Sequence, residues 1–172
     1  EALTPLQPGK IGIYVCGPTV YNLVHIGNAR SFTSFDTVVR YLRYRGFEVT
    51  YVRNYTDVDD KIINAAKETK EPAQELAARF CKEFEADADA LRLLRPDHAP
   101  KVTETIPEIV DLVKSLIANG VAYEAQGDVY FEVGKWPQYA KLSKRNLEDL
   151  QATERVQTGE QKRAPLDFAL WK

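Results

Sequence analysis

Cysteine is scarce in this sequence, and long apolar runs are absent from it. Two cysteines in 172 residues, Cys16 and Cys81, cannot build a disulfide framework. No stretch approaches the roughly 18 consecutive apolar residues of a membrane helix, and no secretory leader is recognisable. We therefore expect a protein of a reducing compartment, the cytoplasm, with no membrane partner.

An excess of basic residues is also missing. Lys and Arg total 23 against 25 Asp and Glu, a net charge of −2, so the chain as a whole lacks the charge of an autonomous nucleic-acid-binding domain. Any contact with RNA must be local or supplied elsewhere. The length and the 44% hydrophobic content suffice for a core that needs neither disulfides nor metal.

The first third of the chain has the pattern of a β-loop-α-β unit. Residues 11–15 form a short apolar run bounded by Pro-Gly and Gly-Pro pairs, and residues 47–53 alternate between apolar and polar side chains, so both segments are expected to be strands. Between them we expect a helix that Asn28 caps and Gly46 ends. Its apolar residues recur at helical spacing: Phe32, Phe35, Val38, Val39 and Leu42. Strands joined in this way run parallel.

The remaining sequence predicts mainly helices. A second helix follows residue 58, with Thr56 and Asp59 spaced as a capping box. Two further helices are expected at 73–94 and 107–119, and a hairpin whose strands, 122–124 and 128–133, flank Ala125-Gln-Gly127. From Gly134 onward the sequence predicts irregular structure with one short helix at 146–151. The carboxylates of Asp57, Asp59 and Asp60 are interpreted as partners of a helix N-terminus rather than as magnesium ligands.

The loop between the first strand and the first helix carries the clearest chemical signal. Neither Gly-x-Gly-x-x-Gly nor Gly-x-x-x-x-Gly-Lys-Ser/Thr occurs, so neither dinucleotide binding nor a P-loop explains the segment. A helix start attracts phosphate through its free N–H groups, Gly27 permits close backbone approach, and His25 offers a donor to an anion forming on a nucleotide. For His25-Ile-Gly-Asn28 taken alone, a capped helix with a structural histidine is the simpler interpretation.

The residues around this loop resemble the start of the catalytic region in the cysteinyl-tRNA synthetase family of class I aminoacyl-tRNA synthetases. The resemblance covers nearly the whole chain. It rests on Tyr14-Val-Cys-Gly-Pro-Thr-Val-Tyr21, His25-Ile-Gly-Asn28, Tyr51-Val-Arg-Asn-Tyr-Thr-Asp-Val-Asp-Asp-Lys-Ile-Ile63, Leu93-Leu-Arg-Pro-Asp97, Tyr139-Ala-Lys-Leu-Ser143 and Lys162-Arg-Ala-Pro-Leu-Asp-Phe-Ala-Leu-Trp-Lys172.

The resemblance implies an α/β fold with a Rossmann-like class I synthetase catalytic domain. Residues 1–67 correspond to the first half of that domain, and residues 68–172 to its helical continuation and an inserted connective lobe, truncated here. The implied reaction joins cysteine to tRNA(Cys) through a cysteinyl-adenylate made from ATP, with magnesium accompanying the ATP. We expect the 172-residue chain to be inactive by itself and the full-length form to be monomeric.

The resemblance also assigns site residues. His25 and Asn28 are the catalytic candidates, and Thr19 and Gly27 join them in binding ATP or the adenylate. Asn28 stands where the family's His-Ile-Gly-His signature has its second histidine, so it keeps hydrogen-bonding capacity but lacks an imidazole. The cysteine-binding candidates are Gly17, Thr56 and Trp171.

Cys16 corresponds to a family ligand of zinc, a metal that prefers sulfur and receives the substrate thiolate. The family's other ligands, a cysteine, a histidine and a glutamate, lie beyond Lys172, and neither Cys81 nor His98 matches their positions. Two alternatives stay open for the function. One is a ligase of the same superfamily that joins cysteine to an amino sugar, and the other is a noncatalytic fragment or scaffold.

Overall fold

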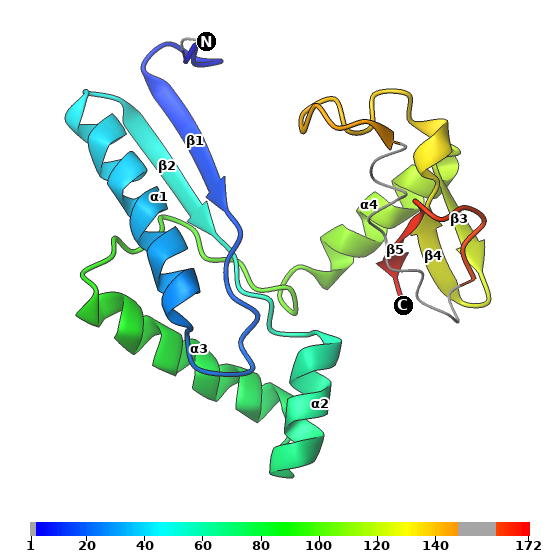
Figure 1. Ribbon diagram of the computed structural model, residues 1–172, viewed down its shortest axis with the longest axis horizontal. Coiled ribbons are helices and arrows are strands. Elements are labelled where there is room, and N and C mark those ends of the chain that lie inside the picture. The colour runs from blue at the N-terminus through cyan, green and yellow to red at the C-terminus, as the bar shows by residue number, and fades with distance from the viewer. Residues whose placement is uncertain (1–2, 148–160) are drawn as a thin grey trace. The chain divides into compact units, whose positions relative to one another are not determined.

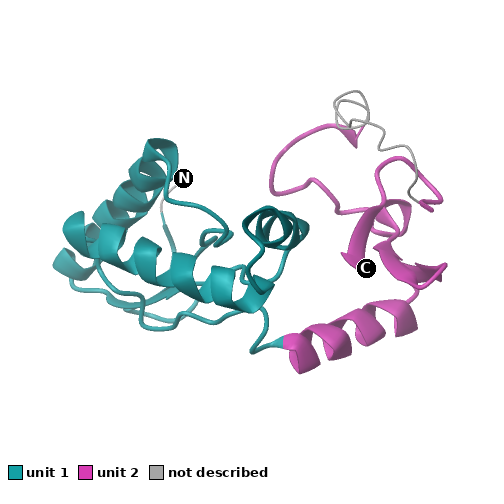
Figure 2. Ribbon diagram, turned by 90° about the horizontal axis from the view of Figure 1, so that it is seen from below, with its two compact units in different colours: residues 1–105 teal, residues 106–172 magenta. Residues whose placement is uncertain are grey.

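The computed structural model describes residues 3–147 and 161–172. By its internal contacts the chain divides into two compact units, Glu1–Thr105 and Ile106–Lys172 (Figure 2). The third helix, which begins at Ala73, belongs to the first unit. In the described ranges, no helix combines the length and the apolar character that crossing a membrane requires.

The first unit contains the expected β-loop-α-β arrangement (Figure 1). Its two strands pair in parallel, with Lys10 opposite Glu48 at one end and Val15 opposite Arg53 at the other, which confirms the parallel prediction. The helix α1 packs against β2. The elements are β1 (Lys10–Val15), α1 (Ile26–Tyr44), β2 (Glu48–Arg53), α2 (Asp60–Thr69) and α3 (Ala73–Ala90).

The core of the first unit lies between the strand pair and the helices. Strand side chains alternate: β2 buries every second residue, whereas the inward residues of β1 are half-buried except for the buried Val15. In this core Phe84 of α3 contacts Phe32 of α1 edge to face, with the ring centroids 5.3 Å apart. The other fully buried members include Val15, Val20, Val39, Tyr51, Ile62 and Leu76.

Both predicted N-caps in this unit are wrong. The first helix begins at Ile26, because His25 is extended and its Nδ1 accepts the Gly27 backbone N–H at 3.1 Å. Asn28 therefore lies in the first helical turn. The second helix is capped by Asp59, which accepts the Lys61 N–H at 2.8 Å, rather than by Thr56.

The buried face of α1 also differs from the prediction. Phe32 and Val39 are buried as expected, but Phe35 and Val38 are 42% and 46% exposed. The polar Asp36 is buried instead, because its carboxylate accepts the Leu94 backbone N–H at 2.7 Å and the Arg40 Nε–H at 2.6 Å. The buried face of α1 therefore includes Asp36, whose carboxylate can be buried because two hydrogen-bond donors satisfy it.

The helix α3 is shorter than the sequence indicates. It ends at Ala90, four residues before the predicted end at Leu94. Arg92 adopts a left-handed backbone with φ 55°, which is incompatible with further helical turns. The chain then returns to β2, where the backbone N–H of Arg53 donates to the carbonyl of His98 at 3.1 Å.

The second unit pairs one helix with an antiparallel sheet. The hairpin prediction is confirmed: Gln126 and Gly127 connect β3 and β4 with positive φ angles of 52° and 93°, as a type I′ turn requires. The strand at the C-terminus, β5, was not predicted. The predicted helix at 146–151 falls mostly outside the described residues. The elements are α4 (Ile106–Ala118), β3 (Ala122–Ala125), β4 (Asp128–Phe131), the 3₁₀ turn η1 (Val133–Lys135) and β5 (Phe168–Trp171).

A buried carboxylate organises the second unit. Asp167 has no solvent exposure. It accepts hydrogen bonds from the Tyr123 hydroxyl at 2.8 Å and from the backbone N–H groups of Val133 and Ala164, each at 3.1 Å. These contacts tie β3, the turn η1 and the segment before β5 to one side chain.

Candidate functional site

The loops that leave β1 and β2 are joined to each other directly. The Gly17 N–H donates to Asn54 Oδ1 at 2.8 Å, and the Thr56 N–H donates to the Pro18 carbonyl at 3.1 Å. A Cβ at position 17 would lie only 1.6 Å from the Asn54 carbonyl oxygen. Glycine is therefore required at position 17 by the close approach of two backbones, whatever else this residue contacts.

His25 has a defined hydrogen-bonding state at the start of α1. Because Nδ1 accepts the Gly27 N–H, the proton of the neutral imidazole is on Nε2. The side chain is exposed, so Nε2–H is a donor directed away from the helix backbone. This tautomer is the one that can donate to an oxyanion beside the helix start.

A cavity of about 490 Å³ lies beside this helix start. Its volume is in the range that holds small-molecule ligands. Three of the four predicted adenylate residues, Thr19, His25 and Asn28, line it, and the fourth, Gly27, orients His25 instead. The wall also includes Lys61 from the first turn of α2, a cation that the sequence analysis did not single out.

The cysteine-binding candidates fall in both units. Gly17 and Thr56 lie in the two joined loops of the first unit, where both are half-buried. Trp171 ends β5 in the second unit and is 37% exposed. A pocket formed by all three residues therefore stays a prediction.

Cys16 is exposed at the end of β1, where its thiol contacts the Gly17 carbonyl at 3.8 Å. Zinc sites in proteins take about three or four protein ligands. Within residues 3–147 and 161–172, no group of three or more His, Cys, Asp or Glu side chains is placed to hold a metal ion. The described residues therefore do not form a zinc site by themselves, and Cys16 supplies at most one ligand.

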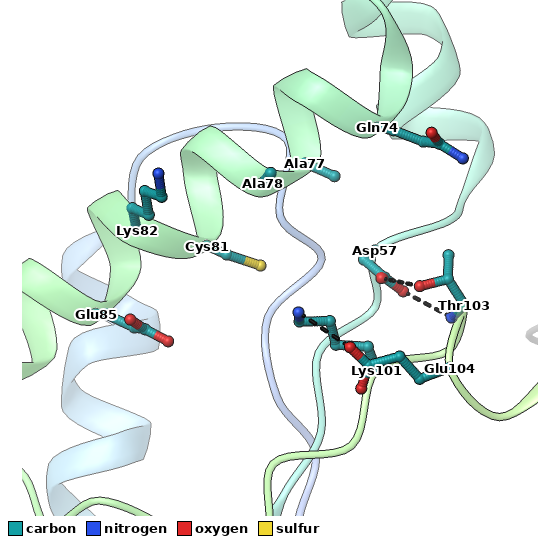
Figure 3. A pocket seen from close by; sticks show the side chains of 10 residues that line it. All are labelled: Asp57, Gln74, Ala77, Ala78, Cys81, Lys82, Glu85, Lys101, Thr103 and Glu104. Carbon is teal, nitrogen blue, oxygen red and sulfur yellow. Dashed lines mark hydrogen bonds and ion pairs between the residues drawn. The ribbon is translucent and has the colours of Figure 1, made fainter.

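A second cavity, of about 440 Å³, lies between α3 and the loop at 101–104 (Figure 3). The Asp57 carboxylate is hydrogen-bonded elsewhere than to the start of α2, where it was predicted to be. It instead accepts hydrogen bonds from the backbone N–H and the hydroxyl of Thr103. The Cys81 sulfur points into this space from α3 (Figure 3), and Lys101 pairs with Glu104 at 3.2 Å.

The two thiols should differ sharply in reactivity. Burial raises the pKa of Cys81 to about 11, so that only about 10⁻⁴ of it is thiolate at pH 7. We expect iodoacetamide to alkylate the exposed Cys16 in the native chain while Cys81 stays intact, and to alkylate both in urea. Peptide mass spectrometry over time measures both rates. Equal alkylation of the two cysteines in the native chain would contradict the burial of Cys81.

Arg53 is a buried cation that the sequence analysis missed. It is 1% exposed, and its Nε has no hydrogen-bond partner in the described part of the chain. Its guanidinium carbon lies 4.9 Å from the ring centroid of Phe84 and 5.4 Å from that of Phe32. Cation–π contacts offset part of the desolvation cost. Phe84 also lines the His25 cavity, so Arg53 packs against a residue of the cavity wall.

Comparison with known proteins identifies the family. A sequence model described as "tRNA synthetases class I (C) catalytic domain" matches residues 2–172. The chain is 58% identical over 171 residues to a protein named "Cysteine--tRNA ligase" from Anaeromyxobacter sp. (strain Fw109-5), and 55% identical over 172 residues to one of the same name from Desulforudis audaxviator. It is 52% identical to "Cysteine--tRNA ligase, chloroplastic/mitochondrial" from Arabidopsis thaliana.

These matches cover nearly all of this chain but a minor part of each relative. The matched region is 99% or 100% of the chain, against 36% of the two bacterial proteins and 31% of the plant protein. The parallel strand pair and the helix-start loop agree with the α/β class expected for such a catalytic domain. This chain belongs to the family of class I (C) tRNA synthetase catalytic domains.

Proposed function

We propose that the full-length protein containing this chain activates cysteine with ATP and transfers it to tRNA(Cys). The observation that carries the proposal is the cavity at the start of α1, where Thr19, His25 and Asn28 lie together and Nε2–H of His25 is free to donate. The names of relatives more than 50% identical to this chain support the same reaction.

In the first step, a cysteine carboxylate oxygen attacks the α-phosphorus of magnesium-bound ATP. The bond from that phosphorus to the bridging oxygen breaks, and pyrophosphate leaves. The His25 Nε2–H donates to a nonbridging oxygen as negative charge develops on it, and the N-terminal dipole of α1 acts in the same direction. In the second step, a hydroxyl of the terminal ribose of the tRNA attacks the carbonyl of the adenylate, the bond from that carbonyl to the phosphate oxygen breaks, and AMP leaves while the hydroxyl proton passes to the departing phosphate or to solvent.

The wider assignment follows the family. Residues 1–67 are proposed as the first half of a Rossmann-like catalytic domain, and residues 68–172 as its helical continuation and inserted connective lobe. Gly17, Thr56 and Trp171 are proposed to bind the cysteine substrate. We propose a cytoplasmic, monomeric full-length enzyme, of which the 172-residue chain alone does not charge tRNA.

Zinc is proposed as a metal of the full-length protein, with Cys16 as one ligand and the others outside this chain. We expect the 172-residue chain to retain less than stoichiometric zinc after dialysis, because residues 3–147 and 161–172 place no three ligands together. The full-length protein should retain it, and Cys16→Ser should lower that retention. Elemental analysis of both proteins measures this. Stoichiometric zinc on the short chain would show that the ligands are wrongly assigned.

The experiment that tests the function uses the full-length protein. Cysteine-dependent exchange of pyrophosphate into ATP measures activation, and charging of tRNA(Cys) measures transfer, with serine as the matched competitor. Activation and charging together support the proposal. Activation followed by transfer to an amino sugar, without tRNA charging, supports the alternative ligase. Absence of both activities supports the scaffold.

A further inference from the structure

A hollow of about 440 Å³ borders the His25 cavity, and the proposed activation step leaves it without a ligand. The two spaces share four lining residues, Tyr21, Asn22, Lys61 and Phe80. The far end of the hollow is formed by α2, whose polar side chains at this place are Asn64, Glu68 and Thr69. We call this hollow the Lys61 groove.

Lys61 stands between the two spaces as an exposed cation. In the described ranges its ammonium group makes no ion pair, and it lies 5.9 Å from the centroid of the Tyr21 ring. Tyr21 is itself 36% exposed. A cation beside an exposed aromatic ring is the combination that binds single-stranded nucleic acid, since the cation binds phosphate and the ring stacks on a base.

The other polar groups of the groove fit a nucleoside better than a polyphosphate. The Glu68 carboxylate repels concentrated negative charge but accepts hydrogen bonds from ribose hydroxyls. The amide of Asn64 offers both donor and acceptor atoms to a base edge. A triphosphate is thus disfavoured beyond Lys61, whereas a nucleotide with one phosphate at Lys61 is accommodated.

We propose that the Lys61 groove binds the single-stranded 3′ end of the tRNA, with a phosphate at Lys61 and a base stacked on Tyr21. The inference rests on the proposed function, because transfer requires the terminal ribose to reach the adenylate in the His25 cavity. The nucleotides just before that ribose must then lie in an adjoining space, and the groove shares a wall with the cavity.

The test compares Lys61→Ala with Lys61→Arg in the full-length protein, and uses Lys67→Ala as the matched control. Lys67 is an exposed lysine on the same helix that lines neither space. Binding is measured by fluorescence anisotropy with tRNA(Cys) and with the same tRNA lacking its three 3′-terminal nucleotides. ATP–pyrophosphate exchange is measured in parallel.

Lys61→Ala should weaken binding of intact tRNA about tenfold. The plot of log affinity against log salt concentration should become less steep by about 0.7, the value for one phosphate contact on a single strand. Lys61→Arg should restore most of the affinity. The truncated tRNA should bind wild type and Lys61→Ala equally. Because Lys61 also lines the His25 cavity, the KM for ATP in the exchange reaction is a separate readout for both variants, and Lys67→Ala should leave that KM and the tRNA affinity unchanged.

Two results would overturn the inference. A raised KM for ATP with unchanged tRNA binding would assign Lys61 to the triphosphate. An equal loss of affinity for intact and truncated tRNA would place the contact away from the 3′ end. A wild-type protein without exchange activity would refute the proposed function, whereas the binding comparison would still decide whether the groove holds an RNA end.

Discussion

Replacement of His25 by asparagine should slow cysteine-dependent pyrophosphate exchange about 10²- to 10³-fold in the full-length protein. Removing one preorganised donor from a site of developing negative charge typically costs about 2.7 to 4 kcal/mol of transition-state stabilisation. Asparagine is a good N-cap and can accept the Gly27 N–H in place of Nδ1, so the helix start is preserved. The loss therefore reports on Nε2–H. Single-turnover adenylate formation measures it without the later steps.

Two further variants separate chemistry from folding. His25→Ala removes the cap as well as the donor, so it should match the kinetic loss of His25→Asn and also lower the free energy of unfolding by about 1 kcal/mol. His98→Asn, at the other histidine, should have wild-type kinetics, since His98 does not line the cavity. A His25→Asn enzyme with normal adenylate formation but weakened tRNA binding would show that His25 does not act on the phosphate.

Replacement of Asp167 by asparagine should lower the stability of the second unit by about 2 to 3 kcal/mol. Both carboxylate oxygens accept hydrogen bonds, and an amide nitrogen in place of either one would face a donor. Hydrogen bonds to charged groups are worth about 1.5 to 3 kcal/mol each, and a buried donor left without an acceptor adds a cost of its own. Asp167→Ala should cost about 3 to 5 kcal/mol, because all three donors lose their acceptor.

The chain offers a local probe for this prediction. Its two tryptophans, Trp136 and Trp171, both lie in the second unit, so urea unfolding followed by tryptophan fluorescence reports on that unit. Glu124→Gln, an exposed acid-to-amide change on β3, is the matched control and should leave the midpoint unchanged. An unchanged midpoint for Asp167→Asn would show that the buried carboxylate does not hold the unit together.

Local sequence patterns correctly predicted the helices, strands and turns whose conformation depends mainly on residues close by in the sequence. Periodicity and flanking glycines predicted β1, α1 and β2 and their parallel pairing, which the register confirms. The segment Ala125-Gln-Gly127 predicted the hairpin, and in the structure its turn residues Gln126 and Gly127 both have positive φ. The strand-end position of the His25 loop followed from the same order of elements.

Features that depend on distant residues could not be predicted in this way. Phe32 and Phe35 have the same local character, whereas the stripe of α1 that is buried includes Asp36, which accepts a hydrogen bond from Leu94, 58 residues away. Asp167 has donors 44 and 34 residues away in the sequence. Arg53 and Lys61 both lie in the family-like segment 51–63. Neither spacing nor composition in that segment shows that Arg53 is buried and Lys61 is exposed.

The cavity at the start of α1 is proposed to hold the adenylate. The most direct measurement is a crystal structure of the full-length protein with a non-hydrolysable cysteinyl-adenylate analogue. We predict that the phosphate-mimicking group lies within hydrogen-bonding distance of His25 Nε2 and that Thr19 and Asn28 contact the nucleotide. An analogue bound away from this cavity, with His25 still exposed to solvent, would contradict the assignment.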